Sequence, residues 1–297
     1  MESSNHFKSI REINDTIYLE YFGTRERLKN DTYTLDNNVP IKTGLKQLDS
    51  IIGPIPSDSL YVIGGRPAMG KTSLMIDIAL NMAKYKPIYI FYLESDAEYI
   101  AKRILSKMSD IDLITLGDKP LKNDEKERIK KCIEALDKYN IYVCENVLDS
   151  NKISEIIESE ARDGIVFIDY LQLMDTGLEN YNNRAIITGV RPKYSRQNEI
   201  ADGFKNLVKK CNIPVIVLSQ LNRSVEKRKN KRPTLDEIRY NKHIAESADT
   251  VIFIYRKAYY SYEDKSKEAE LIVAKNNRGK TGTAIVQFDN RIGKFFE

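Results

Sequence analysis

The sequence predicts an α/β protein in which a mostly parallel central β-sheet is flanked by helices. The first observation is a series of short apolar runs, separated from residue 60 onward by segments of helical pattern. Several runs are apolar throughout instead of alternating with polar residues, which is typical of strands covered on both faces. The second observation is a glycine-rich loop between the first run and a helical segment. The expected strands cover residues 60–65, 86–94, 139–146, 164–174, 213–220, 249–256, 269–277 and 283–289.

Composition and charge exclude several classes of protein. The chain has 297 residues, of which 41% are hydrophobic, so it can bury a large core. Charged residues make up 30% of the chain but nearly cancel to a net charge of +4, so any basic surface must be local. No apolar run approaches the roughly 20 residues of a membrane-spanning helix, and no membrane contact is expected. Cys132, Cys144 and Cys211 lack CxxC spacing, which disfavours a thiol metal site and favours a reducing, cytoplasmic location.

The chain divides into a short N-terminal extension, residues 1–38, and a large domain, residues 39–297. Residues 9–31 of the extension have a helical pattern, and residues 36–44 have the irregular, polar pattern of a linker. The extension is too short to form a second domain of ordinary size. We therefore expect the chemistry to lie in the large domain.

The loop after the first expected strand fits the phosphate-binding pattern GxxxxGK[ST]. It opens onto an amphipathic helix, because Met75, Ile78, Ala79 and Met82 recur at helical spacing. In such a unit, backbone N–H groups hold phosphate oxygens, the lysine reaches the β- and γ-phosphates, and the next hydroxyl binds Mg²⁺. The strand and helix disfavour the alternative, an ordinary turn with a surface lysine. The residues assigned to binding the nucleotide and Mg²⁺ are Gly65, Arg66, Pro67, Ala68, Met69, Gly70, Lys71, Thr72 and Ser73.

Three polar side chains stand at the ends of other expected strands, where ligands bind in open α/β sheets. Asp169 is the expected Mg²⁺ ligand beside Thr72, with a charge at a strand edge as the alternative. Glu94 is the expected general base for the attacking water, or else a solvated strand-end glutamate. Gln220 suits a sensor of the γ-phosphate, or else is a surface glutamine. Together with Lys71, these residues predict a site of ATP hydrolysis.

Five segments carry a resemblance more specific than a phosphate-binding loop. They read GGRPAMGKTSLMIDIA, FYLES, GIVFIDYLQLM, IPVIVLSQLNRSVEKRKNKRPTLDEIR and ESADTVIFIYR. In this order the chain resembles the C-terminal motor domain of DnaB-type replicative helicases, from about Val39 onward. The resemblance implies a RecA-like fold and a ring, usually a hexamer, that unwinds forked DNA 5′ to 3′ by moving on single-stranded DNA. It matches Glu94 to the family's catalytic glutamate and Gln220 to its phosphate sensor.

The resemblance also implies that each ATP site lies between two subunits and needs a cation from the neighbour. Lys275 matches a lysine of the family, but the usual arginine two residues later is replaced here by Asn277. Arg278 follows directly, so we expect it to act as the arginine finger. A solvated hairpin tip is the alternative for this basic turn.

Residues 222–243 are basic and irregular, and they follow the expected phosphate sensor. Such a run is commonly a solvated face, yet here it could grip DNA phosphates. Arg223, Arg239 and Lys242 are the expected DNA contacts. The family commonly has Arg-Glu-Ser-Gly where this chain has Arg-Tyr-Asn-Lys, so Tyr240 could stack on a base. Residues 175–195, which also follow a strand, could form a second DNA or partner contact.

Members of this family usually carry an N-terminal domain that docks primase, and residues 1–38 match only the linker helix that packs on the adjacent subunit. A compact helicase of a phage, plasmid or bacterium is therefore expected, with a helicase loader or replisome proteins as further partners. Two alternatives stay open. One is a RecA-like, DNA-stimulated ATPase that remodels or loads nucleoprotein without processive unwinding, and the other is a regulator of a host helicase.

Overall fold

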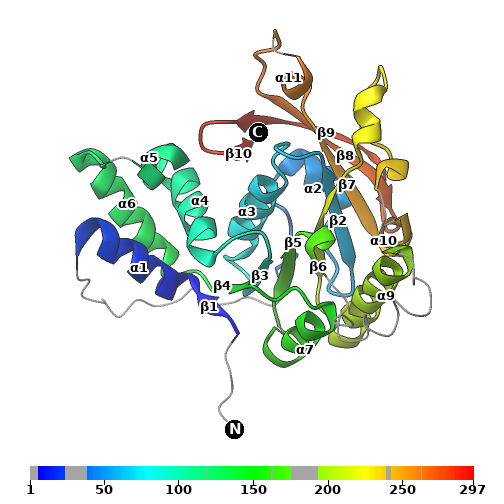
Figure 1. The fold of residues 1–297 in the computed structure, drawn as a ribbon, viewed down its shortest axis with the longest axis horizontal. Coiled ribbons are helices and arrows are strands. Elements are labelled where there is room, and N and C mark those ends of the chain that lie inside the picture. The colour runs from blue at the N-terminus through cyan, green and yellow to red at the C-terminus, as the bar shows by residue number, and fades with distance from the viewer. Residues whose placement is uncertain are drawn as a thin grey trace, which may run out of the picture.

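One mixed β-sheet runs through the centre of the computed structural model (Figure 1). The structure describes residues 6–23, 39–118, 120–161, 163–174, 193–238, 242–261 and 263–297. The strands are β1 (Lys8–Ser9), β2 (Leu60–Gly65), β3 (Ile88–Tyr92), β4 (Ile141–Glu145), β5 (Ile165–Asp169), β6 (Val215–Gln220), β7 (Thr250–Tyr255), β8 (Glu268–Asn276), β9 (Gly282–Asp289) and β10 (Lys294–Phe296). Their order in the sheet is β1-β4-β3-β5-β6-β2-β7-β8-β9-β10.

The centre of the sheet is parallel and its two edges are antiparallel. The six strands from β4 to β7 in the sheet order pair in parallel. β1 pairs antiparallel with β4, and β7, β8, β9 and β10 pair antiparallel with one another in succession. Only residues 277–281 connect β8 to β9, too few for the crossover that a parallel pair requires. The expected mostly parallel sheet is confirmed, and the last strands form hairpins on its edge.

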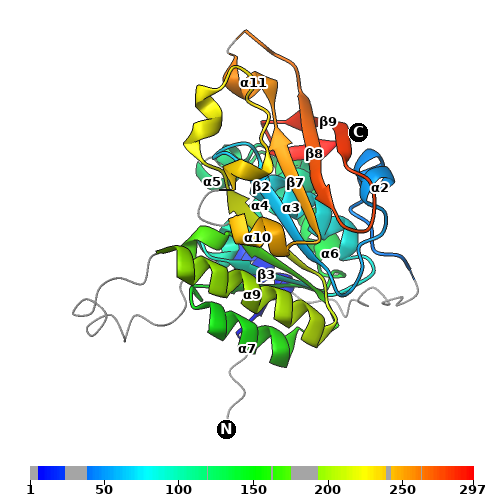
Figure 2. The ribbon, with the colours of Figure 1, turned by 90° about the vertical axis from the view of Figure 1, so that its right-hand side faces the viewer.

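Helices cover both faces of the sheet, as Figures 1 and 2 show. The helices are α1 (Ile10–Phe22), α2 (Lys46–Ile52), α3 (Lys71–Met82), α4 (Ala97–Ser109), α5 (Leu113–Asp118), α6 (Asn123–Leu136), α7 (Ser150–Glu160), α9 (Lys193–Cys211), α10 (Lys242–Ser247) and α11 (Lys257–Tyr260). The 3₁₀ helices in the described part of the chain are η1 (Leu171–Leu173), η3 (Arg223–Lys227) and η4 (Leu235–Glu237). Among the described residues, no helix combines the length and apolar character needed to cross a membrane.

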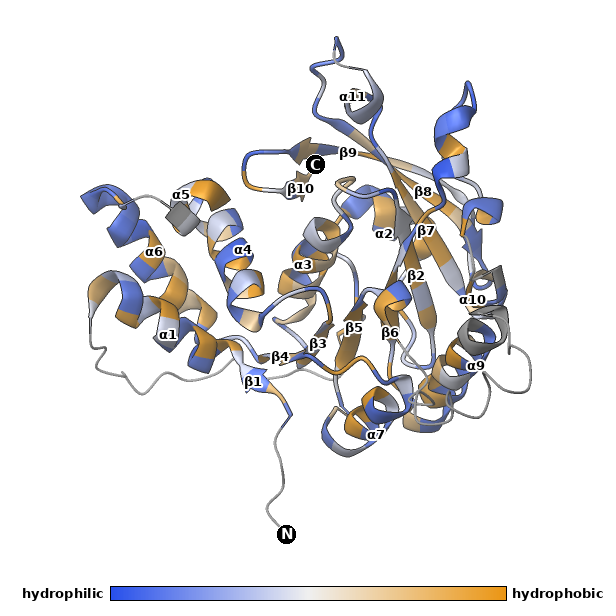
Figure 3. Cartoon of the chain, in the orientation of Figure 1, coloured by the Kyte–Doolittle hydropathy of each residue, from blue (hydrophilic) through white to orange (hydrophobic). Residues whose placement is uncertain are grey.

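Two hydrophobic cores lie on opposite faces of the parallel strands. Alternate residues of β2 point to different faces, so Tyr61 and Ile63 join one core while Leu60 and Val62 join the other. The first core holds residues of α1, α2, α3, α4 and α6, and the second holds residues of α7, α9 and α10. Figure 3 shows hydrophobic residues concentrated in the strands and on the inner sides of the helices. The apolar runs of the sequence are therefore explained by cover on both faces.

Helix α1 packs within its own chain. Ser9 caps the N-terminus of α1 and forms a capping box with Glu12. Its buried residues Ile10, Ile13 and Ile17 belong to the first core, where α1 contacts α4 and α6. The helical pattern is realised as far as Phe22, and residues 24–38 lie outside the described part of the chain. The expected packing of this helix on an adjacent subunit stays a prediction, because the apolar face is covered here by the same chain.

Candidate functional site

The glycine-rich loop joins β2 to α3 at the carboxyl edge of the parallel strands. Gly70 adopts φ +101°, and a Cβ placed on it would lie 3.0 Å from the ring of Phe295, so both conformation and space require glycine there. Helix α3 starts at the next residue and presents the free N–H groups of its first turn to the loop. The expected helix with buried Met75, Ile78 and Met82 is confirmed. The loop therefore has the geometry of an anion-binding cradle.

Lys71 is held inside this cradle. Its Nζ donates to the carbonyl oxygen of Arg66 at 3.3 Å. Burial lowers the pKa of Lys71, while the nearby carboxylates of Asp169 and Glu94 oppose that shift. A desolvated ammonium group next to free backbone N–H groups is suited to bind a highly charged phosphate chain.

Asp169 ends β5 and is only 1% exposed. Its Oδ2 accepts a hydrogen bond of 2.6 Å from the Thr72 hydroxyl, and its Oδ1 is buried with no hydrogen-bond partner among the described residues. Burial raises the pKa of Asp169 to about 6, although the hydrogen bond from Thr72 and the charge of Lys71 both lower it. An unpartnered carboxylate oxygen beside a hydroxyl is a donor set that suits a hard cation such as Mg²⁺. Thr72 and Asp169 therefore fit the ion that the sequence assigns to them.

The raised pKa predicts a pH-dependent gain in stability for Asp169→Asn in the nucleotide-free, metal-free protein. A carboxyl group with a folded pKa near 6 instead of 3.8 makes folding less favourable as pH rises from about 4 to about 6. The shift corresponds to at most about 3 kcal/mol. The melting temperature of Asp169→Asn minus that of the wild type should therefore increase across this interval and stay level above it.

Thermal melts of both proteins at a series of pH values test this prediction, with Asp236→Asn as the control at an exposed aspartate. The control should give a difference that is small across the same range. A difference for Asp169→Asn that does not change between pH 4 and pH 6 would contradict the burial argument.

Glu94 and Gln220 reach the same edge of the sheet from two other strands. Glu94 is exposed two residues after β3, and Gln220 is the last residue of β6, opposite Gly65 in the register. Gln172 fixes this strand end, because its amide donates to the Gln220 carbonyl at 3.1 Å and accepts from the Gln220 N–H at 3.0 Å. Gln172 follows the Asp169 strand in the sequence, but no sequence pattern indicated this positioning role.

These strand ends and the loop line one pocket of about 510 Å³. Its wall contains most of the expected site residues, namely Pro67, Ala68, Gly70, Lys71, Thr72, Ser73, Glu94, Asp169 and Gln220. A buried carboxylate, an exposed carboxylate, a half-buried ammonium and an amide thus surround one space. The arrangement can bind a nucleoside triphosphate and activate water against its terminal phosphate.

Three residues of the loop do not line the pocket. Gly65 ends β2, and Met69 is buried in the first hydrophobic core. Arg66 is 5% exposed, donates to the Leu221 carbonyl at 2.6 Å and forms an ion pair of 2.7 Å with Glu226. The side chain of Arg66, expected at the nucleotide, therefore ties the loop to the segment that follows β6.

The pocket wall also contains residues that sequence analysis missed. Arg103 of α4 faces the pocket and donates to the Ser73 hydroxyl at 2.8 Å. The far wall comes from α5 and from the turn between β9 and β10, residues 290–293. These segments carry no motif, and only the tertiary fold brings them to the loop.

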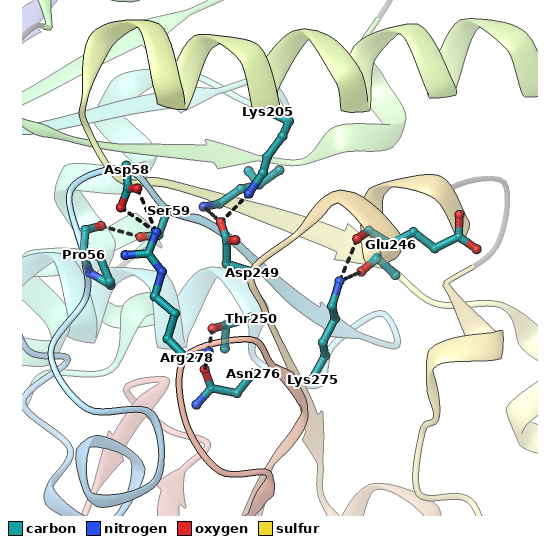
Figure 4. A network of polar contacts seen from close by, with 12 residues as sticks. Pro56, Asp58, Ser59, Lys205, Glu246, Asp249, Thr250, Lys275, Asn276 and Arg278 are labelled. Atoms are coloured by element: carbon teal, nitrogen blue, oxygen red, sulfur yellow. Dashed lines mark hydrogen bonds and ion pairs between the residues drawn. The ribbon is translucent and has the colours of Figure 1, made fainter.

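Lys275 and Arg278 lie near the amino ends of the parallel strands, whereas the pocket lies at their carboxyl ends. β8 runs antiparallel to β7, so the β8–β9 turn lies beside the first residue of β7, roughly 20 Å of strand from its carboxyl end. There Arg278 makes hydrogen bonds of 2.7 and 2.8 Å to the two carboxylate oxygens of Asp58, as Figure 4 shows. Lys275 donates to the carbonyl oxygens of Ala245 and Glu246 at 3.0 and 2.6 Å. Within one chain these two cations therefore do not join the pocket.

The expected DNA contacts are only partly described. Arg223 begins η3 and is exposed. Lys242 begins α10, but its side chain lies outside the described residues, as do Arg239, Tyr240 and residues 175–192. The DNA contacts stay predictions.

Comparison with known proteins finds one matching family model and several similar proteins. Residues 40–297 match the family described as the DnaB-like helicase C terminal domain. A probable replicative DNA helicase of Trieres chinensis is 33% identical over 268 residues, which cover 86% of this chain and 57% of that protein. The chain spans about three fifths of the length of the curated relatives that it matches.

Two solved structures share the fold. The ATPase domain of G40P has a TM-score of 0.79 and 25% identity, covering 97% of this chain and 98% of that one. A DnaB-like replicative helicase, described with its interactions with primase, has a TM-score of 0.79 and 26% identity, covering 89% of this chain and 64% of that one. The expected RecA-like α/β fold is thereby confirmed.

Proposed function

The chain belongs to the DnaB-like helicase C-terminal domain family, and on this premise we propose that it is the ATP-driven motor of a replicative DNA helicase. The motor forms a ring, usually of six copies, and moves 5′ to 3′ on single-stranded DNA while it unwinds the duplex ahead. It acts in the cytoplasm of a bacterial cell, on DNA of the bacterium, a phage or a plasmid. A helicase loader or other replisome proteins are its further partners.

One observation carries this proposal. The groups for binding and hydrolysing ATP gather at the carboxyl ends of the parallel strands, whereas Arg278 lies near their amino ends. A subunit with a pocket at one end of its strands and a cation at the other end can pair head to tail with identical subunits. Such head-to-tail contacts can close into a ring. The geometry thus supports a hydrolysis site completed by a neighbour.

Each residue of the pocket has a definite task in this proposal. The loop N–H groups and Lys71 bind the phosphates, and Thr72 and Asp169 hold Mg²⁺, which supplies charge stabilisation when bound. Glu94 accepts a proton from the attacking water, and Gln220 hydrogen-bonds near the terminal phosphate. Arg278 of a neighbouring copy, with Lys275, approaches the same phosphate from outside. Arg223, Arg239 and Lys242 contact DNA phosphates in the channel.

Strand displacement on a forked duplex with a 5′ single-stranded tail tests the proposed function. The wild type with ATP and Mg²⁺ should release the displaced strand, while Lys71→Ala should release none because it cannot hold the terminal phosphate. A matched fork with only a 3′ tail is the control for polarity.

If the wild type hydrolyses ATP under DNA stimulation but never displaces a strand, the helicase proposal fails. A nucleoprotein-remodelling ATPase would then be the better description. If neither activity is present, the regulator of a host helicase replaces both.

A further inference from the structure

A buried pair of opposite charges lies behind the wall of the pocket. Lys107 of α4 and Asp77 of α3 are 3% and 8% exposed, and Lys107 Nζ lies 2.9 Å from Asp77 Oδ1. Lys107 Nζ also donates to the carbonyl oxygens of Ser73, at 3.0 Å, and of Gly293. Asp77 Oδ2 accepts from the backbone N–H of Phe295 at 2.8 Å. The pair therefore links two helices to the backbone around β10.

Burying both charges costs desolvation free energy, so this pair stabilises the core poorly for its size. Burial lowers the pKa of Lys107 to about 8, although Asp77 opposes the shift, and burial raises the pKa of Asp77. Apolar side chains of similar volume commonly stabilise a core as well as a buried ion pair does. Unlike apolar packing, the pair fixes the orientation of its neighbours, because all three donors of the Lys107 ammonium have hydrogen-bond acceptors. Its specific effect is to fix the position of the chain at Gly293 and Phe295.

The segment fixed in this way forms part of the pocket wall. The β9–β10 turn, residues 290–293, faces the loop and the start of α3. A Cβ on Gly293, which has φ +61°, would lie 3.0 Å from the Ser73 hydroxyl, so the turn lies directly on α3. At the other end of the turn, buried Arg256 bonds to Asn290 and to the Ala68 carbonyl. The turn is thus anchored at both ends against the phosphate-binding unit.

The rest of the pocket indicates what this wall contacts. The loop, Asp169, Glu94 and Gln220 supply the groups for phosphates and water. Much of the remaining surface comes from the β9–β10 turn and residues 112–114, which combine polar atoms with the apolar side chains of Leu113, Ile114 and Ile292. The other lining residues are Arg103, Ser106, Tyr170 and Phe288. A base and a ribose need such a mixed surface. The nucleoside end of the ligand is therefore expected on this mixed surface, which includes the turn that Lys107 supports.

We propose that Lys107 and Asp77 are positioning residues for nucleotide binding, which hold the β9–β10 turn as the wall for the nucleoside part of ATP. This inference rests on the ATP site of the proposed function. The pair touches no phosphate and takes no part in hydrolysis. Its loss should weaken the binding of ATP while leaving the binding of a bare triphosphate chain intact.

Equilibrium binding of ATP and of inorganic tripolyphosphate, each with Mg²⁺, tests the proposal in the full chain. Lys107→Met alone leaves a charged, unpaired Asp77, so the test uses Lys107→Met combined with Asp77→Asn, which keeps an oxygen for the Phe295 N–H. This variant should bind ATP about tenfold more weakly and tripolyphosphate within about twofold of the wild type. Lys102→Met, a lysine on the same helix paired with Glu98, is the matched control and should change neither.

A second measurement needs no substitution. In the wild type, ATP should slow amide hydrogen exchange in residues 290–296 more than tripolyphosphate does. Equal weakening of both ligands in the double variant would show a purely structural role and overturn the proposal, as would unchanged ATP binding or equal protection by the two ligands. If the wild type binds ATP no more tightly than tripolyphosphate, this proposal fails while the proposed function stands. A wild type that binds neither ligand overturns the proposed function with it.

Discussion

Replacing Lys71 by alanine should reduce the rate of ATP hydrolysis about a thousandfold. The half-buried ammonium of Lys71 lies inside the loop, and desolvation lowers its pKa, so its charge acts at reduced dielectric on the phosphate chain. Without it, Asp169 and Glu94 would face the phosphates with less opposing charge. Steady-state phosphate release with ATP and Mg²⁺ measures the effect.

Lys84→Ala is the matched control for this change, because Lys84 is an exposed lysine just beyond the end of α3. It should hydrolyse ATP at close to the wild-type rate. Circular dichroism should show that Lys71→Ala keeps its fold. If the properly folded Lys71→Ala retained a substantial part of the activity, the assignment of the loop would be wrong.

Replacing Arg278 by alanine should lower hydrolysis by about a thousandfold or more in the assembled protein, the range found for arginine fingers supplied in trans. The guanidinium should leave Asp58 and approach the neighbour's terminal phosphate, where its charge has more effect than at the exposed ion pair. ATP binding should change much less than hydrolysis, because the phosphate-binding loop and Lys71 of each pocket belong to the chain that binds the nucleotide. Measuring hydrolysis and nucleotide binding on the same preparation separates the two effects.

Lys280→Ala is the matched control in the same β8–β9 turn, and it should keep most of the activity. Asp58→Asn removes the partner that Arg278 has within its own chain, and it should not reduce hydrolysis. Equal losses in Arg278→Ala and Lys280→Ala would point to a disturbed turn instead of a lost finger.

The parts of the site that sequence analysis predicted share a local or topological cause. The loop and α3 are contiguous, so strand, glycine pattern and helical spacing are all visible in one stretch. Asp169, Glu94 and Gln220 are far apart in sequence, but each follows a buried apolar run. In a parallel sheet, such runs end at the same edge, which is why these residues meet.

The parts that were missed depend on contacts that no local pattern contains. Lys107 lies thirty residues from Asp77 in sequence, and a lysine on an amphipathic helix gives no sign that it is buried. The β9–β10 turn reaches the pocket only because the last strands fold back as hairpins. Arg66 was assigned to nucleotide binding from its place in the loop. Its side chain instead donates to a carboxylate and a carbonyl of the segment after β6.

The most direct test of a hydrolysis site divided between two copies is to mix Arg278→Ala subunits with Lys71→Ala subunits and measure ATP hydrolysis. Each variant alone should be nearly inactive. At equal amounts, about one interface in four should combine an intact Lys71 pocket with an intact Arg278, so about a quarter of the wild-type rate should return. No recovery at any mixing ratio, from subunits that do assemble together, would contradict the account.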